Sequence, residues 1–220
     1  GNPPTVFCTN GTVGFAARGA VLPLDDLLAS SSIKASDYLD SGWVTASWRG
    51  KKYGVPCIDW GAICGLLWNK ELFQKAGLDP EKPPKDPTEL RAFADKLFEV
   101  DSTGNIKVVG FDPRDATANS FWHWAMMWDV PLRPNVWDPD KEQIYVNKPY
   151  MIEALNHIKG YFDKWGADKF AAFRQTYSTW TGNAKSGFVQ GQQAMLITGS
   201  YAAGEIKRYN PDLAPKIGYT

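Results

Sequence analysis

The sequence predicts an α/β fold in which strands and helices alternate around a largely parallel sheet. Apolar runs of strand length are followed, at regular intervals, by segments with helical spacing along the 220 residues. No internal repeat, low-complexity tract or Pro/Ser-rich linker interrupts this order. With 44% hydrophobic residues, the chain can bury one large core or two small ones.

Charge and hydropathy exclude several classes of partner. Acidic and basic side chains balance at a formal net charge of +0, whereas nucleic-acid and anionic-membrane surfaces favour a basic excess. No apolar stretch is long enough to span a bilayer, and no signal peptide is present. Because the chain starts with Gly1 without an initiator Met, we expect a leader to be missing upstream.

Short elements are expected in the first part of the chain. Thr5–Thr9 has the pattern of a short strand, Val13–Gly19 that of a short helix, and a helical stretch is expected near Tyr38–Trp48. Gly50 and the two lysines after it form a turn.

The chain is organised around the stretch that follows. Tyr53–Gly61 is interrupted by Gly and Pro, so it is expected to be an irregular connecting segment. Ala62–Trp68 has the length and flanks of a buried strand. Asn69 can cap a short helix that Gly77 ends.

The next helix has a strong start signal. Asp86 is its expected N-cap, followed by Pro87 and then by Glu89 in the capping-box position. Its apolar residues recur at i, i+3, i+4 and i+7, which predicts one buried face: Leu90, Phe93, Ala94 and Leu97. The remaining expected elements are a strand at Ile106–Phe111, an aromatic helix from Ser120 to Trp128, a strand at Ile144–Val146, a long helix from Pro149 to Gly166 with Leu155 on its apolar face, a helix at Asp168–Arg174, and strands at Ala194–Thr198 and Lys216–Tyr219.

Motifs for catalysis and cofactor binding are not found in the sequence. It has no Gly-x-Ser-x-Gly elbow, no phosphate-binding glycine loop and no dinucleotide fingerprint. The two histidines, His123 and His157, are far apart and lack metal-ligand partners nearby. We therefore expect no catalytic residues, no metal and no cofactor.

Three cysteines leave the redox state open. Cys8, Cys57 and Cys64 have no metal-ligand spacing, and one disulfide among them is possible, but nothing in the sequence selects a pair. Cys64 falls in the apolar run and is expected to be a buried thiol.

Polar turns beside aromatic residues are the candidate site. In open α/β sheets, ligands bind outside the carboxyl ends of strands, where amides and carboxylates can hydrogen-bond sugar hydroxyls and flat rings can cover a pyranose face. Four turns qualify, and their residues are Thr9, Asn10, Asp59, Trp60, Phe121, Trp122, Gly199, Ser200 and Tyr201.

Each of these residues has an alternative role. Asp59 fits a turn residue that bonds its own backbone about as well as it fits a ligand contact. Phe121 and Trp122 are each an even choice between a position in the cleft and one in the core. Tyr201 would lie in the first turn of the next helix, where its ring can cover a sugar face, with Gly199 leaving room for a ligand and Ser200 capping that helix. Asp112 and Arg114, in a loop near the same rim, are expected to be solvated.

Two sequence patches resemble a known family. The first runs from Tyr53 through Trp68-Asn69-Lys70 to Leu78, and the second from Phe188 through Gly191 and Ala194-Met195 to Gly199 and Tyr201. Both are similar to the extracytoplasmic solute-binding proteins of ABC transporters, in the sugar-binding branch that includes maltose-binding protein.

This resemblance implies a two-lobe, type II periplasmic-binding-protein fold. Residues 1–58 would form part of the first lobe, 59–61 the hinge crossing and 62–220 a second lobe that is incomplete at its C-terminal end. The first lobe would expose apolar surface, because its opening strands are not found in this chain.

The same resemblance implies a function. The protein would bind a mono- or oligosaccharide between its lobes and deliver it to a membrane permease outside the cytoplasm, either free in the periplasm or lipid-anchored. The alternative is a carbohydrate-active enzyme with two carboxylates flanking one bond, for which Asp59, Asp112 and Glu205 are the candidates.

Overall fold

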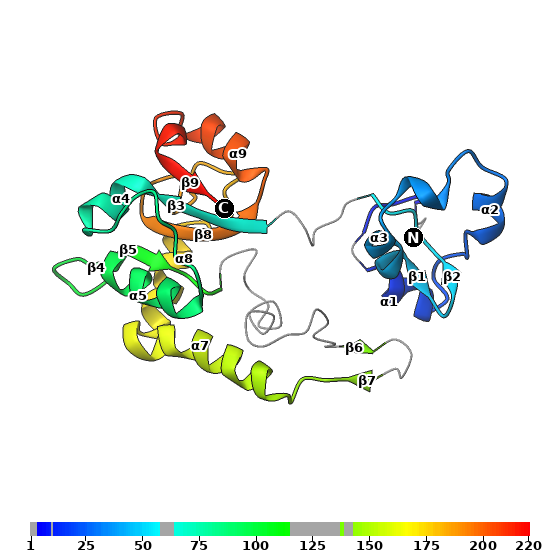
Figure 1. Ribbon diagram of the computed structural model, residues 1–220, viewed down its shortest axis with the longest axis horizontal. Helices are drawn as coiled ribbons and strands as arrows, with labels where there is room; N and C mark the ends of the chain where they lie inside the picture. The colour runs from blue at the N-terminus through cyan, green and yellow to red at the C-terminus, as the bar shows by residue number, and fades with distance from the viewer. Residues whose placement is uncertain (1–3, 10, 58–63, 115–136, 139–142) are drawn as a thin grey trace. The chain divides into compact units, whose positions relative to one another are not determined.

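The computed structural model describes residues 4–9, 11–57, 64–114, 137–138 and 143–220. The chain divides into two compact units, Gly1–Ile63 and Cys64–Thr220, each of which is described here by itself (Figure 1). The expected hinge crossing at residues 59–61 and the expected aromatic helix at residues 120–128 lie outside the described residues.

The first unit is built from short helices and one hairpin. Its elements are α1 (Thr12–Ala17), α2 (Asp25–Ala29), the 3₁₀ helix η1 (Ala35–Asp37), α3 (Asp40–Ala46), β1 (Ser47–Trp48) and β2 (Lys51–Lys52). Arg49 and Gly50 connect the two strands with φ values of 47° and 75°, the conformation of a tight hairpin turn. The helices expected near residues 13–19 and 38–48 are thereby confirmed.

Residues 5–9 do not form the expected strand. In the described part of this unit β1 and β2 pair with each other, and residues 5–9 pair with neither. The apolar composition of this segment alone is not enough to form a strand, because a strand needs a partner for its backbone groups.

Little apolar surface is buried in the first unit. Among its described residues the buried hydrophobic side chains are Ala16 and Ala46. Large apolar side chains are instead exposed, as the sequence predicts for this unit: Val6, Phe7, Leu22, Leu27, Ile33, Leu39 and Val44.

The second unit contains a five-stranded sheet with the order β4-β5-β8-β3-β9. These strands are β3 (Cys64–Asn69), β4 (Glu99–Val100), β5 (Ile106–Phe111), β8 (Gln193–Gly199) and β9 (Ile217–Tyr219). A separate two-stranded hairpin pairs β6 (Trp137–Asp138) with β7 (Gln143–Ile144), close to the strand expected at residues 144–146.

The expectation of a largely parallel sheet is wrong. Among the pairings described, β5 with β8 is parallel, whereas β3 pairs antiparallel with both β8 and β9, and β4 pairs antiparallel with β5. Helical crossovers connect β5 to β8 and β8 to β9, and these three strands do share one direction. Strand β4 instead joins β5 by a tight turn, and β3 enters the unit without a preceding crossover.

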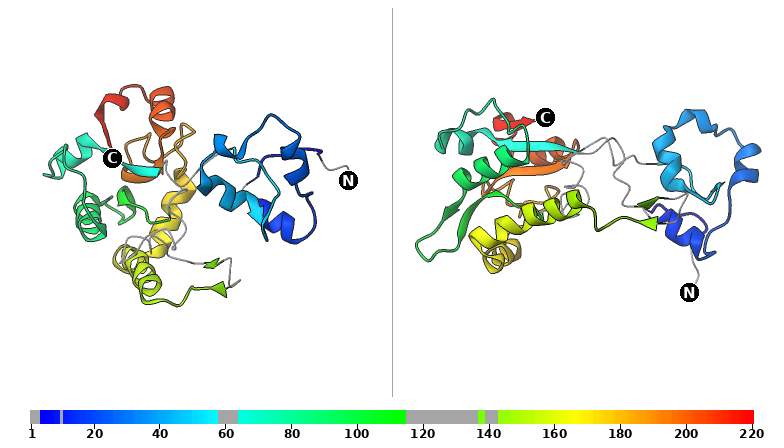
Figure 2. Two further views of the ribbon diagram at one scale, coloured as in Figure 1. Left: turned by 45° about the vertical axis from the view of Figure 1, so that its right-hand side comes forward. Right: turned by 60° about the horizontal axis from the view of Figure 1, so that its bottom comes forward.

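Helices cover both faces of this sheet (Figures 1 and 2). They are α4 (Lys70–Lys75), α5 (Pro87–Leu97), α7 (Pro149–Trp165), α8 (Ala167–Thr176), α9 (Ala202–Tyr209) and the 3₁₀ helix η2 (Ala214–Lys216). One buried cluster joins Trp68, Phe111 and Met195 to α5, α7 and α8, and a second joins Leu67 and Leu196 to α9. Neighbouring strand residues thus face opposite layers, which explains why the central strands are mostly apolar.

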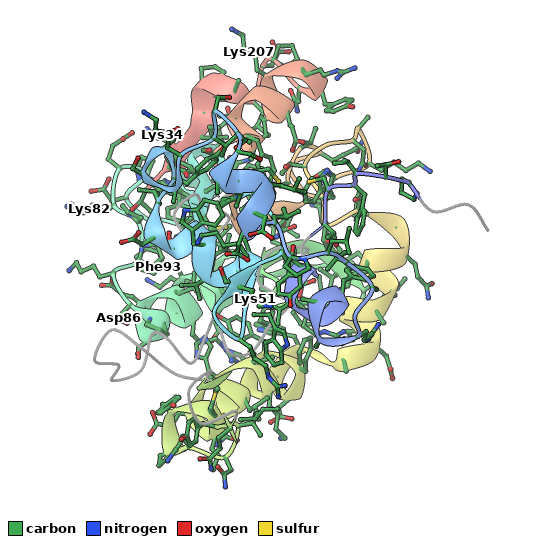
Figure 3. The ribbon with its side chains drawn as sticks, turned by 90° about the vertical axis from the view of Figure 1, so that its right-hand side faces the viewer. Lys34, Lys51, Lys82, Asp86, Phe93 and Lys207 are labelled. Carbon is green, nitrogen blue, oxygen red and sulfur yellow. The ribbon has the colours of Figure 1, made fainter. Side chains whose placement is uncertain are left out.

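The predicted helix starts are confirmed. The Asn69 side chain accepts hydrogen bonds from the backbone N–H groups of Glu71 and Leu72 at 3.0 and 3.1 Å, and Asp86 accepts one from Glu89 N at 2.8 Å. Asp86 and Phe93, at the start and on one face of α5, are labelled in Figure 3. In the predicted buried face of α5, Leu90, Ala94 and Leu97 are buried and Phe93 is partly buried.

Three expectations for single residues are wrong. Cys64 is exposed rather than buried, since β3 begins there at the end of the sheet. Leu155 on α7 remains 46% exposed. Ser200 does not cap α9, because the helix begins one residue later with Tyr201 at the N-cap and no side-chain cap.

Candidate functional site

The carboxyl ends of β5 and β8 define a rim of the second unit. The two strands are parallel neighbours, with Phe111 paired to Met195, so the residues that follow each strand emerge at the same end of the sheet. Asp112 follows β5, while Ser200 and Tyr201 follow β8. Cys64, at the start of β3, pairs with Gly199 and lies at this end too.

A buried ion pair anchors this rim. Asp112 is fully buried and accepts two hydrogen bonds from the guanidinium of Arg174 on α8, from Nε to Oδ2 at 2.7 Å and from Nη2 to Oδ1 at 2.5 Å. The backbone N–H of Arg114 also donates to Asp112 Oδ1 at 2.9 Å. The expectation of a solvated Asp112 is therefore wrong. With both oxygens occupied, this carboxylate holds the β5 loop against α8.

Two aromatic rings stack at the end of β8. The centroids of Trp180 and Tyr201 are 5.4 Å apart and their planes are inclined by 26°. Trp180 is 41% exposed, whereas Tyr201 is partly buried and its hydroxyl is hydrogen-bonded to Thr198 Oγ1 at 3.3 Å. The exposed indole is thus the ring that this pair offers to solvent.

The loop that carries Trp180 is held in place by its own hydrogen bonds. Ser178 Oγ accepts from the backbone N–H of Trp180 at 3.1 Å and from Asn183 Nδ2 at 2.9 Å. The hydroxyl of Thr181 donates to Glu205 on α9, and that threonine is buried. Trp180 is therefore presented from a loop whose polar groups are largely satisfied.

A hollow of about 440 Å³ opens beside the same loop. Polar groups line it, among them those of Arg174, Tyr177, Ser178, Asn183 and Lys185. Hydroxyl and amide groups can both donate and accept, which suits a ligand rich in hydroxyl groups.

Gly199, Ser200 and Tyr201 are the sequence-predicted site residues that the structure brings together at this rim. Gly199 does not leave room for a ligand as expected, because a Cβ placed on it would lie 2.3 Å from the Tyr201 ring. Its missing side chain makes space for Tyr201 itself. Ser200 is exposed.

The other sequence-predicted residues belong to the first unit or lie outside the described residues. Thr9 belongs to the first unit, where its Oγ1 accepts a hydrogen bond from Gly11 N at 3.0 Å. Five lie outside the described residues: Asn10, Asp59, Trp60, Phe121 and Trp122.

Sequence reasoning missed Trp180 and the partnership of Asp112 with Arg174. The signal for Trp180 is its setting, a single ring among Ser, Thr, Gly and Asn without a periodic apolar face to join. No comparable signal exists for Asp112, because its partner is distant in sequence.

The described residues contain neither a candidate metal site nor a membrane-spanning helix. No group of three or more His, Cys, Asp or Glu residues could hold a metal ion there. In the same residues, no helix has both the length and the apolar composition to cross a bilayer.

Comparisons with known proteins give a consistent result. A family model described as bacterial extracellular solute-binding protein matches residues 1–220. The sn-glycerol-3-phosphate-binding periplasmic protein UgpB of Yersinia pseudotuberculosis serotype I (strain IP32953) is 28% identical over 212 residues, which cover 90% of this chain and 43% of UgpB.

Solved structures match the fold. CpMnBP1 with mannotriose bound has a TM-score of 0.74 and 31% identity, over 96% of this chain and 51% of that one. An ABC transporter solute-binding protein from Thermotoga lettingae TMO, bound with alpha-D-tagatose, has a TM-score of 0.64 and 22% identity over the same shares. The chain spans about half the length of these proteins.

Proposed function

Because the chain belongs to the family of bacterial extracellular solute-binding proteins, whose model matches residues 1–220, we propose that it binds a neutral sugar, most simply a short oligosaccharide. The observation that carries this proposal is the stack of Trp180 on Tyr201 at the carboxyl-end rim of the sheet. An exposed indole backed by a second ring presents a flat apolar surface to the C–H face of a pyranose.

The buried ion pair favours a neutral ligand at the position of Arg174, although Lys185 also lines the hollow. The Arg174 guanidinium is neutralised by the buried Asp112, so its charge is not available to hold a phosphate. Of the relatives, UgpB is named for sn-glycerol-3-phosphate, whereas CpMnBP1 holds mannotriose and shares 31% of its aligned residues with this chain. We therefore take a neutral oligosaccharide as the ligand class rather than a glycerol phosphate.

The proposal includes a domain arrangement. Residues 1–58 would belong to one lobe, 59–61 to the hinge and 62–220 to the other lobe, with the ligand held by both. Closure would work by population shift, because a ligand that contacts both lobes only in the closed state stabilises that state. Thr9, Asn10, Asp59, Trp60, Phe121, Trp122, Ser200 and Tyr201 remain proposed ligand contacts, with Gly199 as the position that admits the Tyr201 ring.

We propose further that the loaded protein delivers its solute to an ABC-transporter permease outside the cytoplasm. The family is one of extracellular binding proteins, so binding without turnover is expected. Asp112, one of the carboxylates considered for the enzyme alternative, is committed to Arg174, and Glu205 accepts a hydrogen bond from Thr181.

Isothermal titration tests the proposal, followed by product analysis of the same samples. The panel contains mannobiose, mannotriose, maltose and sn-glycerol-3-phosphate. Micromolar or tighter binding of at least one neutral oligosaccharide, without new products, is expected. Binding of the phosphate alone would overturn the ligand class, and appearance of shorter sugars would favour the enzyme.

A further inference from the structure

Two exposed cysteines meet in the first unit. The Sγ atoms of Cys8 and Cys57 are 3.3 Å apart, although the residues stand near opposite ends of that unit in sequence. Cys64 starts a strand of the second unit. The structure thus selects one pair where the sequence leaves three possibilities.

Contacts on either side hold Cys8 at this position. The ring of Phe7 packs edge-to-face on Phe15 of α1, with centroids 5.5 Å apart. On the other side, Thr9 Oγ1 accepts a hydrogen bond from Gly11 N. The backbone of Cys8 is therefore positioned by its neighbours on both sides.

Cys57 is positioned in a similar way by the residues before it. Pro56 packs so closely on α3 that a Cβ added at Gly42 would lie 2.9 Å from the proline Cβ. The backbone N–H of Tyr53 donates to Ala46 O, at the end of the same helix, at 2.9 Å. Two independent contacts thus fix the chain where it leaves the first unit.

The first unit has little else to stabilise it. Its buried hydrophobic residues, among those described, are two alanines, and small domains with small cores commonly depend on disulfides. A bond between residues 8 and 57 would close nearly the whole unit into one loop, and long loops lose the most unfolded-state entropy when closed.

We propose that Cys8 and Cys57 form a structural disulfide in this protein. The oxidant is a disulfide of a protein or a small molecule. The thiolate of one cysteine attacks that disulfide, forms a mixed disulfide with one half of the oxidant and expels the other half as a thiolate. The thiolate of the second cysteine then attacks the sulfur of the first cysteine and expels the remaining half of the oxidant as a second thiolate. The two cysteines lose two protons and two electrons, and the oxidant becomes two thiols.

The neighbouring thiol of Cys57 raises the pKa of Cys8 above its ordinary value, mainly through their hydrogen bond. Sulfurs 3.3 Å apart must approach by roughly 1.3 Å to bond, a shift that side-chain rotations can supply.

The experiment is a disulfide map of the purified protein after equilibration with oxidised and reduced glutathione. Trypsin cuts after Arg18, Lys52 and Lys70, so Cys8 falls in one peptide while Cys57 and Cys64 share another. The map is therefore made in the Cys64→Ser background, with Cys57→Ser as the matched variant, after alkylation of the remaining thiols.

We expect Cys64→Ser to yield the peptide 1–18 joined to the peptide 53–70, and both peptides separately after reduction. Reduction should also lower the midpoint of the lower-temperature unfolding transition of Cys64→Ser by about 5 °C or more. Reduction should leave the corresponding midpoint of Cys57→Ser unchanged. Two alkylated thiols in oxidised Cys64→Ser, or a link from Cys8 to Cys64 in Cys57→Ser, would overturn the proposal. Circular dichroism of each variant shows that it is folded before the comparison is made.

Discussion

The indole of Trp180 stacks on the phenol of Tyr201, with centroids 5.4 Å apart, and the two residues come from a polar loop and from the N-cap of α9. Tyr201 is in turn seated over Gly199, the last residue of β8. The inner ring is fixed by the fold, and the outer ring faces solvent.

Trp180→Ala is expected to weaken oligosaccharide binding by at least tenfold, about 1.4 kcal/mol, because the stacking surface is lost. Its unfolding midpoint should change little, since Trp180 is 41% exposed. Tyr201→Phe is compared with it, because this change keeps the stacked ring and removes only the hydroxyl that is hydrogen-bonded to Thr198. Calorimetric titration of both variants checks this, and normal affinity in Trp180→Ala would remove the indole from the site.

Arg174→Met should destabilise the second unit by roughly 3–5 kcal/mol, because Asp112 is left charged and buried without its partner. The double variant Asp112→Asn with Arg174→Met should recover a large part of this loss. Urea unfolding measures both. Equal destabilisation in the single and double variants would show that lost packing of the arginine dominates.

Leu97→Ala should cost roughly 2–5 kcal/mol, because Leu97 on α5 is 3% exposed within the main core. Leu155→Ala is the matched control, since that leucine is 46% exposed and its loss should change stability by less than about 0.5 kcal/mol. An unchanged urea midpoint in Leu97→Ala would contradict the packing of α5 on the sheet.

Gly110→Ala should be destabilising by about 1–3 kcal/mol, because a Cβ there would lie 2.0 Å from the carbonyl oxygen of Ala94. This glycine lets α5 lie directly on β5. Gly204→Ala is the control, since Gly204 lies within α9 with nothing near its Cβ position, and this change should stabilise by about 0.5–1 kcal/mol. Opposite signs in the two unfolding midpoints are the expected result.

His157 should make the protein less stable in mild acid. Burial in α7 and the nearby Arg91 guanidinium lower its pKa to about 4 from 6.5. Between these values the unfolded chain binds more protons than the folded one, so stability falls as the pH drops from about 6.5 towards 4. His157→Gln should therefore lose less on going from pH 7 to pH 5, with a smaller midpoint shift by roughly 3 °C. Parallel pH dependence in both proteins would contradict this.

The sequence predicts this fold well where local signals agree with the packing. The two-lobe α/β class is confirmed by the match to known binding proteins. Asn69, Asp86 and the run Ile106–Phe111 are placed as expected, because caps and buried strands are specified by neighbouring residues.

Strand directions and site contacts were harder to predict, since they depend on residues distant in sequence. Nothing local to Cys64–Asn69 says that this strand will run against β8. The Asp112–Arg174 pair and the Trp180–Tyr201 stack likewise join separate segments, and a single sequence without covariation carries no record of such contacts.

The position of β3 between β8 and β9 has a consequence for folding. The first strand of the second unit pairs with its last two, so the centre of the sheet closes only after the intervening segments have been synthesised. Contacts so far apart in sequence slow folding. While the chain emerges, Leu66 and Leu67 stay unpaired, so this unit completes its core only when β8 and β9 are available.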